Sequence, residues 1–161
     1  MVPPAGFDGL IERFDHAAIG LWDVRRALPL VELLGGEFLQ GGDNLRNRFR
    51  WVQFTLPGGS KLELLAPLEE NTFLTGFLER RGEGLHHLTF KVTDLAAAVA
   101  RAEQLGFEIT GLHEDPAWSE AFLHPRSAGG SLIQLAAWDG TAAWAGPSLD
   151  DVLAGRSIDA S

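Results

Sequence analysis

The strongest constraint on the fold of this chain is an internal similarity between two of its segments. Residues 14–66 align with residues 85–137 at a constant offset of 71 without a gap, and 12 of the 53 aligned positions are identical. Ordinary composition gives roughly 3–4 identities over such a length. The identical pairs include His16/His87, Asp23/Asp94, Glu32/Glu103, Gly35/Gly106, Glu37/Glu108, Gly58/Gly129 and Leu64/Leu135. We therefore expect two copies of one module, with residues 1–13 as an extension, 67–84 as a linker and 138–161 as a tail.

Within each segment the residue pattern predicts a strand, a helix and three further strands. The opening strand is expected at residues 14–21 and 85–92, where apolar and β-forming residues gather. Asp23 and Asp94 suit the turn or cap before a helix, which we place at 29–34, with Pro29 as its first residue, and at 95–105. Strands follow at 36–40 and 107–111, and paired glycines indicate hairpins joining 50–56 to 61–65 and 121–124 to 131–136. The predicted fold class is α+β with two tandem βαβββ modules.

The linker and the tail have no counterpart in the similarity. In the linker we predict a short helix over residues 72–80 with Asn71 as its N-cap. The tail is expected to be peripheral, with a short helix over residues 148–153.

The composition of the chain excludes several classes of function. The 161 residues carry a formal net charge of −9, which opposes binding to nucleic acid or to anionic membranes. There is no cysteine, so disulfides and thiol catalysis are excluded. The first residues lack the pattern of a signal peptide, and no apolar run reaches the ~18 residues of a membrane span. We expect a cytoplasmic protein that binds neither nucleic acid nor membranes.

Four polar residues fall in pairs at the offset of 71 and are the candidate metal ligands. His16 pairs with His87 in the opening strands, and Glu63 pairs with Gln134 in the last strands. A single histidine in an apolar strand is more often a hydrogen-bonded core residue than a ligand, but joint placement at one offset favours a shared site. Imidazole, carboxylate and amide donors suit one divalent transition metal: Zn, Co, Ni, Mn or Fe.

Other polar residues are weaker candidates. His86 should point to the face opposite His87 because side chains alternate along a strand. His124, before Pro125, is expected to shape a turn, and His113 lies in a predicted loop, 112–120, that either covers a substrate or is plain surface. The alternating arginines are either a solvated edge or a contact for an anionic substrate; they are Arg46, Arg48 and Arg50.

Several motifs resemble those of methylmalonyl-CoA epimerases, within the vicinal-oxygen-chelate superfamily. They are FLERRGEGLHHL at 77–88, FDH at 14–16, KLELLAPL at 61–68, and FLHP at 122–125 followed by Gly129-Gly130. The resemblance covers roughly residues 14–137. It implies that the two modules curl into a half-barrel sheet cleft, a glyoxalase-like fold, and that the protein is a homodimer. It also implies metal ligands at His16, Glu63, His87 and Gln134.

The chain departs from the epimerase pattern at two places. Epimerases usually carry Gln in the last strand of module one and Glu in the last strand of module two, whereas here Glu63 and Gln134 are interchanged. Epimerisation needs two acid–base groups, and residues 44–50 contain no acid where the second is expected. Asp43 and Glu37 are the nearest carboxylates.

Three functions fit these residues. The first is a metal-dependent isomerase or lyase, epimerase-like or glyoxalase-like, that removes a proton next to a carbonyl of a small molecule with vicinal oxygens. Glu63 would be both ligand and general base. The second is an Fe(II) extradiol-type dioxygenase, since two histidines and one carboxylate activate oxygen in such enzymes. The third is a non-catalytic protein that binds a small molecule of the antibiotic type in a pocket lined by Trp22, Trp51, Phe54 and Trp118.

Overall fold

The computed structural model describes residues 9–139 and 146–159, which fall into two compact units. Of the described residues, the module-one unit contains 16–86 and 146–159, and the module-two unit contains 9–15 and 87–139. Two strands, β1 (Ile11–Gly20) and β5 (Gly84–Val92), each contribute residues to both units.

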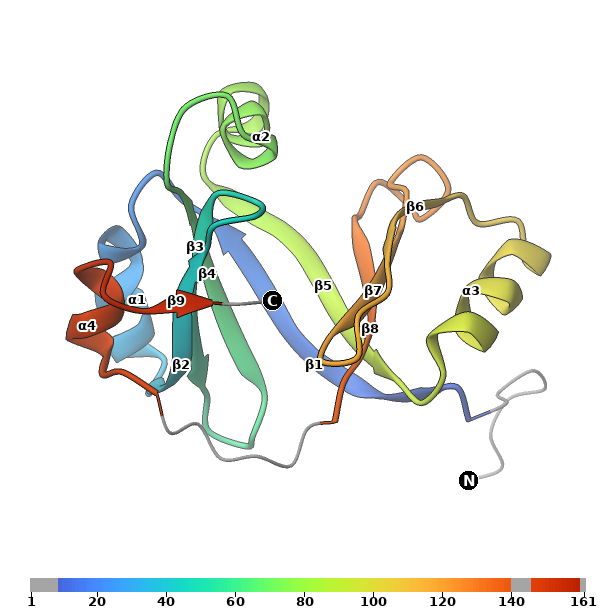
Figure 1. The fold of residues 1–161 in the computed structure, drawn as a ribbon, viewed down its shortest axis with the longest axis horizontal. Coiled ribbons are helices and arrows are strands. Elements are labelled where there is room, and N and C mark those ends of the chain that lie inside the picture. Colours follow the sequence, from blue (N-terminus) through green and yellow to red (C-terminus); the bar gives the residue numbers. More distant parts are fainter. Residues whose placement is uncertain (1–8, 140–145, 160–161) are drawn as a thin grey trace. The chain divides into compact units, whose positions relative to one another are not determined.

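The module-one unit contains a mixed sheet with helices from three parts of the chain (Figure 1). Its strands lie in the order β1, β4, β3, β2, β9, and β1 runs parallel to β4. Besides β1, its elements are η1 (Val24–Ala27), α1 (Leu28–Leu33), β2 (Glu37–Asn44), β3 (Phe49–Thr55), β4 (Lys61–Pro67), α2 (Phe73–Arg81), α4 (Leu149–Leu153) and β9 (Ile158–Asp159).

The module-two unit repeats the same succession of elements. After β5 come α3 (Leu95–Gln104), β6 (Ile109–His113), β7 (Ser119–Leu123) and β8 (Ile133–Ala137). Its strands lie in the order β6, β7, β8, β5, with β5 parallel to β8. The predicted α+β fold class, with a βαβββ succession in each module, is confirmed.

Strand register shows where the aligned segments correspond and where they do not. In each module the first strand pairs with the fourth at a separation of 45 residues (61 − 16 and 133 − 88), as His16 with Lys61 and Leu88 with Ile133. The third strands are displaced. In module one Trp51 lies opposite Leu65, and the offset of 71 aligns these two residues with Phe122 and Ala136. In module two, however, the residue opposite Ala136 is Glu120. The gapless alignment is therefore wrong by two residues in this strand, because the turn between the last two strands is longer in module two.

Helix starts follow the capping rules with one correction. Asp94 accepts a hydrogen bond from the Ala97 amide, and Asp23 accepts one from the Arg25 amide. The prediction of Asn71 as the cap of α2 is wrong. Asn71 has a φ of 59°, and Thr72 is the cap, with its hydroxyl accepting from the Thr75 amide. Thr72 has the extended backbone that an N-cap requires, and the left-handed Asn71 does not.

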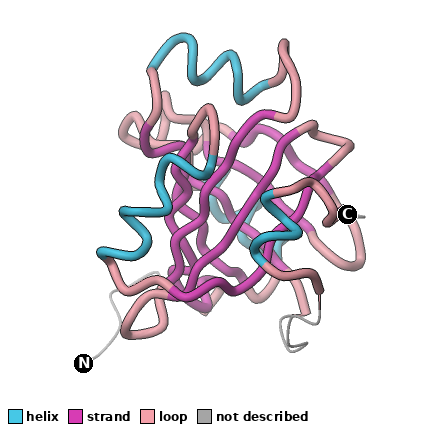
Figure 2. Tube along the Cα trace, turned by 90° about the vertical axis from the view of Figure 1, so that its left-hand side faces the viewer, coloured by secondary structure: helices cyan, strands magenta, loops and turns pink. Residues whose placement is uncertain are grey.

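The two faces of the module-one sheet pack against different helices. Val52 and Leu64 point toward α1 and α4 in a cluster that also contains Val31 and Val152. The alternate residues point the other way, where Leu65 packs with Leu74 of α2 in a second cluster. Figure 2 shows α2 at the top of the strands. Alternation along β4 also places Glu63 on the face of Leu65.

The tail is not peripheral, which corrects the expectation from sequence. Val152 of α4 is 0% exposed and belongs to the module-one core. Beyond it, β9 adds a parallel strand to the edge of β2, and the Ser157 hydroxyl donates to the Gly41 carbonyl at 2.9 Å. Among the described residues this additional layer belongs to module one, so the tail has no counterpart in the similarity.

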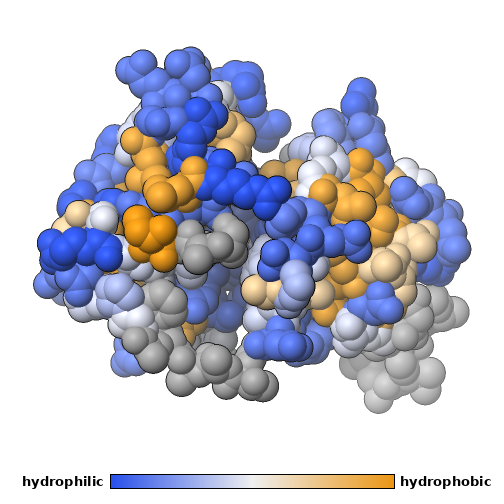
Figure 3. All heavy atoms as spheres, in the orientation of Figure 1, coloured by the Kyte–Doolittle hydropathy of each residue, from blue (hydrophilic) through white to orange (hydrophobic). Residues whose placement is uncertain are grey.

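In the module-two unit α3 covers one face of the sheet. Leu95, Ala98 and Ala102 pack against Leu123 and Leu135 in its hydrophobic core. The other face carries polar residues, described below. Among the described residues, no helix is long and apolar enough to cross a bilayer. The visible surface mixes hydrophilic residues with hydrophobic patches (Figure 3).

Candidate metal centre

Glu63 is a buried carboxylate held by neighbouring amides. It lies in β4 and is 8% exposed, directly opposite Gln53 of β3. The Gln53 amide donates to Glu63 Oε2 at 2.7 Å, and Gln53 Oε1 in turn accepts from the Gln40 amide at 2.7 Å. This chain of hydrogen bonds fixes the plane of the carboxylate, because Gln53 itself is 5% exposed and cannot move freely.

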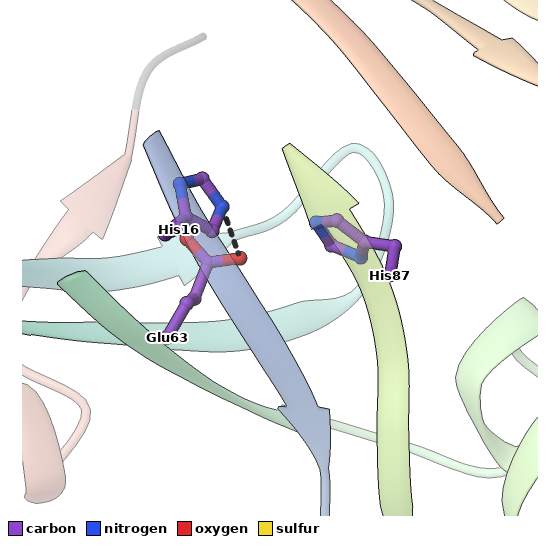
Figure 4. Close-up of side chains that lie close together, drawn as sticks. All are labelled: His16, Glu63 and His87. Carbon is purple, nitrogen blue, oxygen red and sulfur yellow. Dashed lines mark ion pairs between the residues drawn. The ribbon is translucent and has the colours of Figure 1, made fainter. Parts of the chain in front are cut away.

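His16 lies beside this carboxylate. It is 1% exposed in β1, whose residue Ala18 is paired with Glu63 in register. His16 Nε2 is 3.6 Å from Glu63 Oε1, drawn as the dashed line in Figure 4. The carboxylate therefore has Gln53 at one oxygen and an imidazole nitrogen near the other.

His87 and Gln134 share the polar face of the module-two sheet. His87 is 7% exposed and its ring meets that of Phe122 edge-on, with ring centroids 6.1 Å apart. Gln134, 6% exposed, is paired in register with Thr89, whose hydroxyl donates to Gln134 Oε1 at 2.6 Å.

Three of the four predicted ligands form a group whose donors fit a metal ion. One ligand atom from each of His16, Glu63 and His87 lies within 4.8 Å of the others (Figure 4). Two imidazoles and a carboxylate, all buried, are a donor set for divalent Zn, Co, Ni, Mn or Fe. In the module-two unit, the amide of Gln134 bonds to Thr89 and Glu120.

The remaining histidines that the structure describes are His86, His113 and His124. His86 packs edge-on against Phe73 and Phe77 of α2, and burial lowers its pKa from 6.5 to about 4. His124 Nδ1 accepts from the Arg126 amide and shapes the turn after β7, as predicted. His113 ends β6 and so is not in a loop, which corrects the predicted loop boundaries.

Arg50 and Arg48 each pair with a different acidic residue. Arg50 makes a two-point ion pair with Asp43, at 2.6 and 2.9 Å, and also donates to the Leu153 carbonyl. The bond to Asp43 raises the pKa of Arg50 above its ordinary value. Arg48 pairs with Glu69 at 2.7 Å at the surface. Arg50 therefore anchors the tail, and its partner Asp43 is committed to that role.

The predicted aromatic pocket is not assembled within the units. Phe54 is 2% exposed in the cluster beneath α1 and α4, whereas Trp51 packs with the cluster of α2 on the opposite face. Trp118, in the module-two unit, stacks on Trp138 with ring centroids 4.8 Å apart. Trp22 is 44% exposed.

The sequence reasoning missed Gln53 and Glu120, which both contact predicted ligands. Gln53 would have been found by pairing the strands of the first hairpin, since it lies opposite Glu63 on the same face. Glu120 bonds to Gln134 but falls within the predicted loop 112–120. The displacement of the third strand hid Glu120, because the gapless alignment places it in the wrong register.

Comparisons with known proteins agree with this geometry. The model of the Glyoxalase/Bleomycin resistance protein/Dioxygenase superfamily matches residues 15–122. The ethylmalonyl-CoA/methylmalonyl-CoA epimerase of Cereibacter sphaeroides is 33% identical over 132 residues, covering 78% of this chain and 98% of that protein. The mitochondrial methylmalonyl-CoA epimerase of Homo sapiens is 31% identical over 130 residues, covering 76% and 72%. The solved methylmalonyl-CoA epimerase from Mycobacterium tuberculosis has a TM-score of 0.73 at 28% identity, covering 86% and 93%.

Proposed function

The chain belongs to the glyoxalase/bleomycin resistance protein/dioxygenase superfamily, and from this premise we propose that it is a metal-dependent epimerase of malonyl-type CoA thioesters. The proposed substrates carry a small alkyl branch on the carbon between the two carbonyl groups, as in methylmalonyl-CoA. The names of the relatives support this substrate class, since two of them act on such thioesters.

The observation that carries the proposal is the buried group of His16, Glu63 and His87. Burial of a carboxylate and two imidazoles costs free energy unless they are paired or bind a metal. A divalent ion shared by the three side chains would offset that cost. When bound, the metal supplies positive charge that stabilises the negative charge developing on a substrate oxygen.

The residues of the chain divide the remaining work. Glu63 is the proposed general base, because it is the one carboxylate among the four proposed ligands. Gln53 orients it by donating to Oε2, and His16 and His87 hold the metal. Gln134 is the proposed fourth ligand through its amide oxygen. Inversion at the substrate carbon requires that a proton leave one face and return to the other.

Exchange of the substrate proton with solvent tests this function. In D₂O we expect the protein loaded with Co²⁺ to introduce deuterium at the branched carbon of methylmalonyl-CoA, followed by mass spectrometry. Glu63→Gln should abolish the exchange, because an amide cannot accept the proton. Glu69→Gln is the matched control, since Glu69 is an exposed surface acid paired with Arg48. Full exchange by Glu63→Gln would refute the assignment of the base.

The same ligand group is compatible with two other reactions, which can be tested separately. Two histidines and one carboxylate within 4.8 Å also suit an Fe(II) dioxygenase, and oxygen uptake with catechols would identify that activity. A glyoxalase-like lyase would release or rearrange its substrate instead of returning it with an inverted centre. Chiral analysis of the recovered thioester separates the lyase from the epimerase.

We extend the proposal to the organisation of the protein. The equal separation of 45 residues between the first and fourth strands supports an internal repeat, with module one at 14–66 and module two at 85–137. A homodimer is supported by exposed apolar side chains, among them Leu112 of the edge strand β6 at 56%. We place the protein in the cytoplasm. Size-exclusion chromatography with multi-angle light scattering measures the oligomeric state.

A further inference from the structure

Glu120 lies on the polar face of the module-two sheet, next to a proposed metal ligand. In the β7–β8 ladder Phe122 is directly opposite Gln134, and Glu120 lies two residues along β7 from Phe122. Residues two apart in a strand share a face, so the Glu120 side chain reaches Gln134 diagonally. The opposite face of this sheet packs against α3.

Three hydrogen bonds link the side chains on this face. Gln134 Nε2 donates to Glu120 Oε2 at 2.5 Å, and Trp118 Nε1 donates to the same oxygen at 2.8 Å. The Thr89 hydroxyl donates to Gln134 Oε1 at 2.6 Å. The stack of Trp118 on Trp138, with ring planes 24° apart, fixes the indole that holds Glu120.

These bonds set which end of the amide faces which neighbour. A carboxylate accepts hydrogen bonds and donates none, so the amide group next to Glu120 must be the NH₂ end. The amide oxygen then faces the Thr89 hydroxyl, which can donate to one of its two lone pairs and leave the other. A reversed amide would set its oxygen against the Glu120 carboxylate and lose the bond from Gln134 Nε2.

We propose that Glu120 is a positioning residue that orients Gln134 so that its amide oxygen, and not its NH₂ group, is presented to the metal. This inference rests on the proposed function, because it assumes that Gln134 is a ligand. An amide oxygen binds hard and borderline metal ions, and the NH₂ end does not. Glu120 also supplies, on a neighbouring strand, a carboxylate in the module whose last strand carries Gln instead of Glu.

Variants of Glu120 with side chains of similar size distinguish the effect of its hydrogen bond to Gln134 from the effect of its volume. In Glu120→Gln the side chain keeps an oxygen that accepts from Gln134, whereas Glu120→Met has a similar volume and no acceptor. Glu120→Lys offers donors alone, so it favours the reversed amide. Binding of Co²⁺ is measured by calorimetry and by the visible spectrum of the Co²⁺ protein, and circular dichroism checks that each variant is folded.

We expect Glu120→Gln to retain most of the Co²⁺ affinity. Glu120→Met and Glu120→Lys should weaken it by about 10–100-fold, the usual effect of removing a residue that supports a ligand. The double variant Glu120→Lys/Gln134→Glu should recover affinity, because a carboxylate at 134 accepts from Lys and from Thr89 and still offers an oxygen. If Glu120→Lys does not fold, Glu120→Met and the double variant decide.

The outcomes distinguish the inference from the proposed function. If the wild type binds Co²⁺ and Glu120→Met and Glu120→Lys bind it equally well, with unchanged spectra, Glu120 does not position a ligand and the inference is overturned. If the wild type binds no divalent metal, the proposed function fails and the inference fails with it. Weak binding by both variants, with recovery in the double variant, supports both.

Discussion

Replacing Gln53 with leucine removes the support of the proposed base while leaving the volume of the site nearly unchanged. Gln53 and Glu63 are 5% and 8% exposed, and the 2.7 Å bond between them joins a neutral donor to a carboxylate. A hydrogen bond to a charged group contributes about 1.5–3 kcal/mol to stability. The leucine side chain would offer no donor, and little water reaches Glu63 to replace it.

The change should appear in stability and in metal affinity. A loss of about 2 kcal/mol in the free energy of unfolding lowers the melting temperature of a chain of this size by roughly 4–8 °C. Because the carboxylate plane is no longer fixed, the dissociation constant for Co²⁺ should rise by about 10–100-fold. Urea denaturation and calorimetry measure the two quantities on the same preparation.

Gln40→Leu is the matched control, since Gln40 is one bond further from the carboxylate and only half-buried. It loses a bond between neutral groups, which costs about 0.5–1.5 kcal/mol. Its metal affinity should change far less than that of Gln53→Leu. Equal metal affinity in Gln53→Leu and the wild type would refute the view that Gln53 orients a ligand.

Two further predictions concern the tail of the chain. Arg50→Met leaves the buried carboxylate of Asp43 without its cation and should cost about 3–5 kcal/mol of unfolding free energy in urea, whereas Arg48→Met breaks a surface pair worth at most about 1 kcal/mol. Equal costs would contradict the tail-anchoring role of Arg50. Bonds from Arg156 and Ser148 lower the pKa of Asp151 below 3.8, so its stabilising effect is complete above that pH and is lost as the pH falls through the lowered value. Asp151→Asn should therefore reduce the fall of the unfolding free energy at acid pH. An unchanged pH dependence in this variant would refute the stabilising role of the Asp151 carboxylate.

The candidate ligands were predictable from sequence because they lie in the strands whose pairing is the same in the two modules. The first and fourth strands of each module pair at the same register, so one offset of 71 aligns His16 with His87 and Glu63 with Gln134. Three of these four side chains form the observed group. The start of α3 was also predictable from Asp94, and the start of α1 to within one residue from Pro29, because caps and prolines act through local geometry.

What the sequence did not reveal depends on contacts between distant strands. Glu120 was missed because two extra residues in the last turn of module two shift the third strand, and no local pattern marks such a shift. Burial of Val152 was missed because a short amphipathic helix gives no indication of the surface it covers. The partner of Arg50 is likewise set by the register of β2 with β3, where Asp43 lies opposite it.

The central claim is that proton exchange depends on one divalent metal held by His16, Glu63 and His87. The most direct test strips the protein with a chelator, adds Co²⁺ in steps, and follows deuterium incorporation into methylmalonyl-CoA. We predict a rate that is negligible without metal, rises in proportion to Co²⁺ and levels off at one equivalent per chain. We also predict that His16→Ala/His87→Ala shows no such rise. A stripped protein that exchanges the proton at the full rate, unaffected by added metal, would show that the exchange does not depend on this metal site.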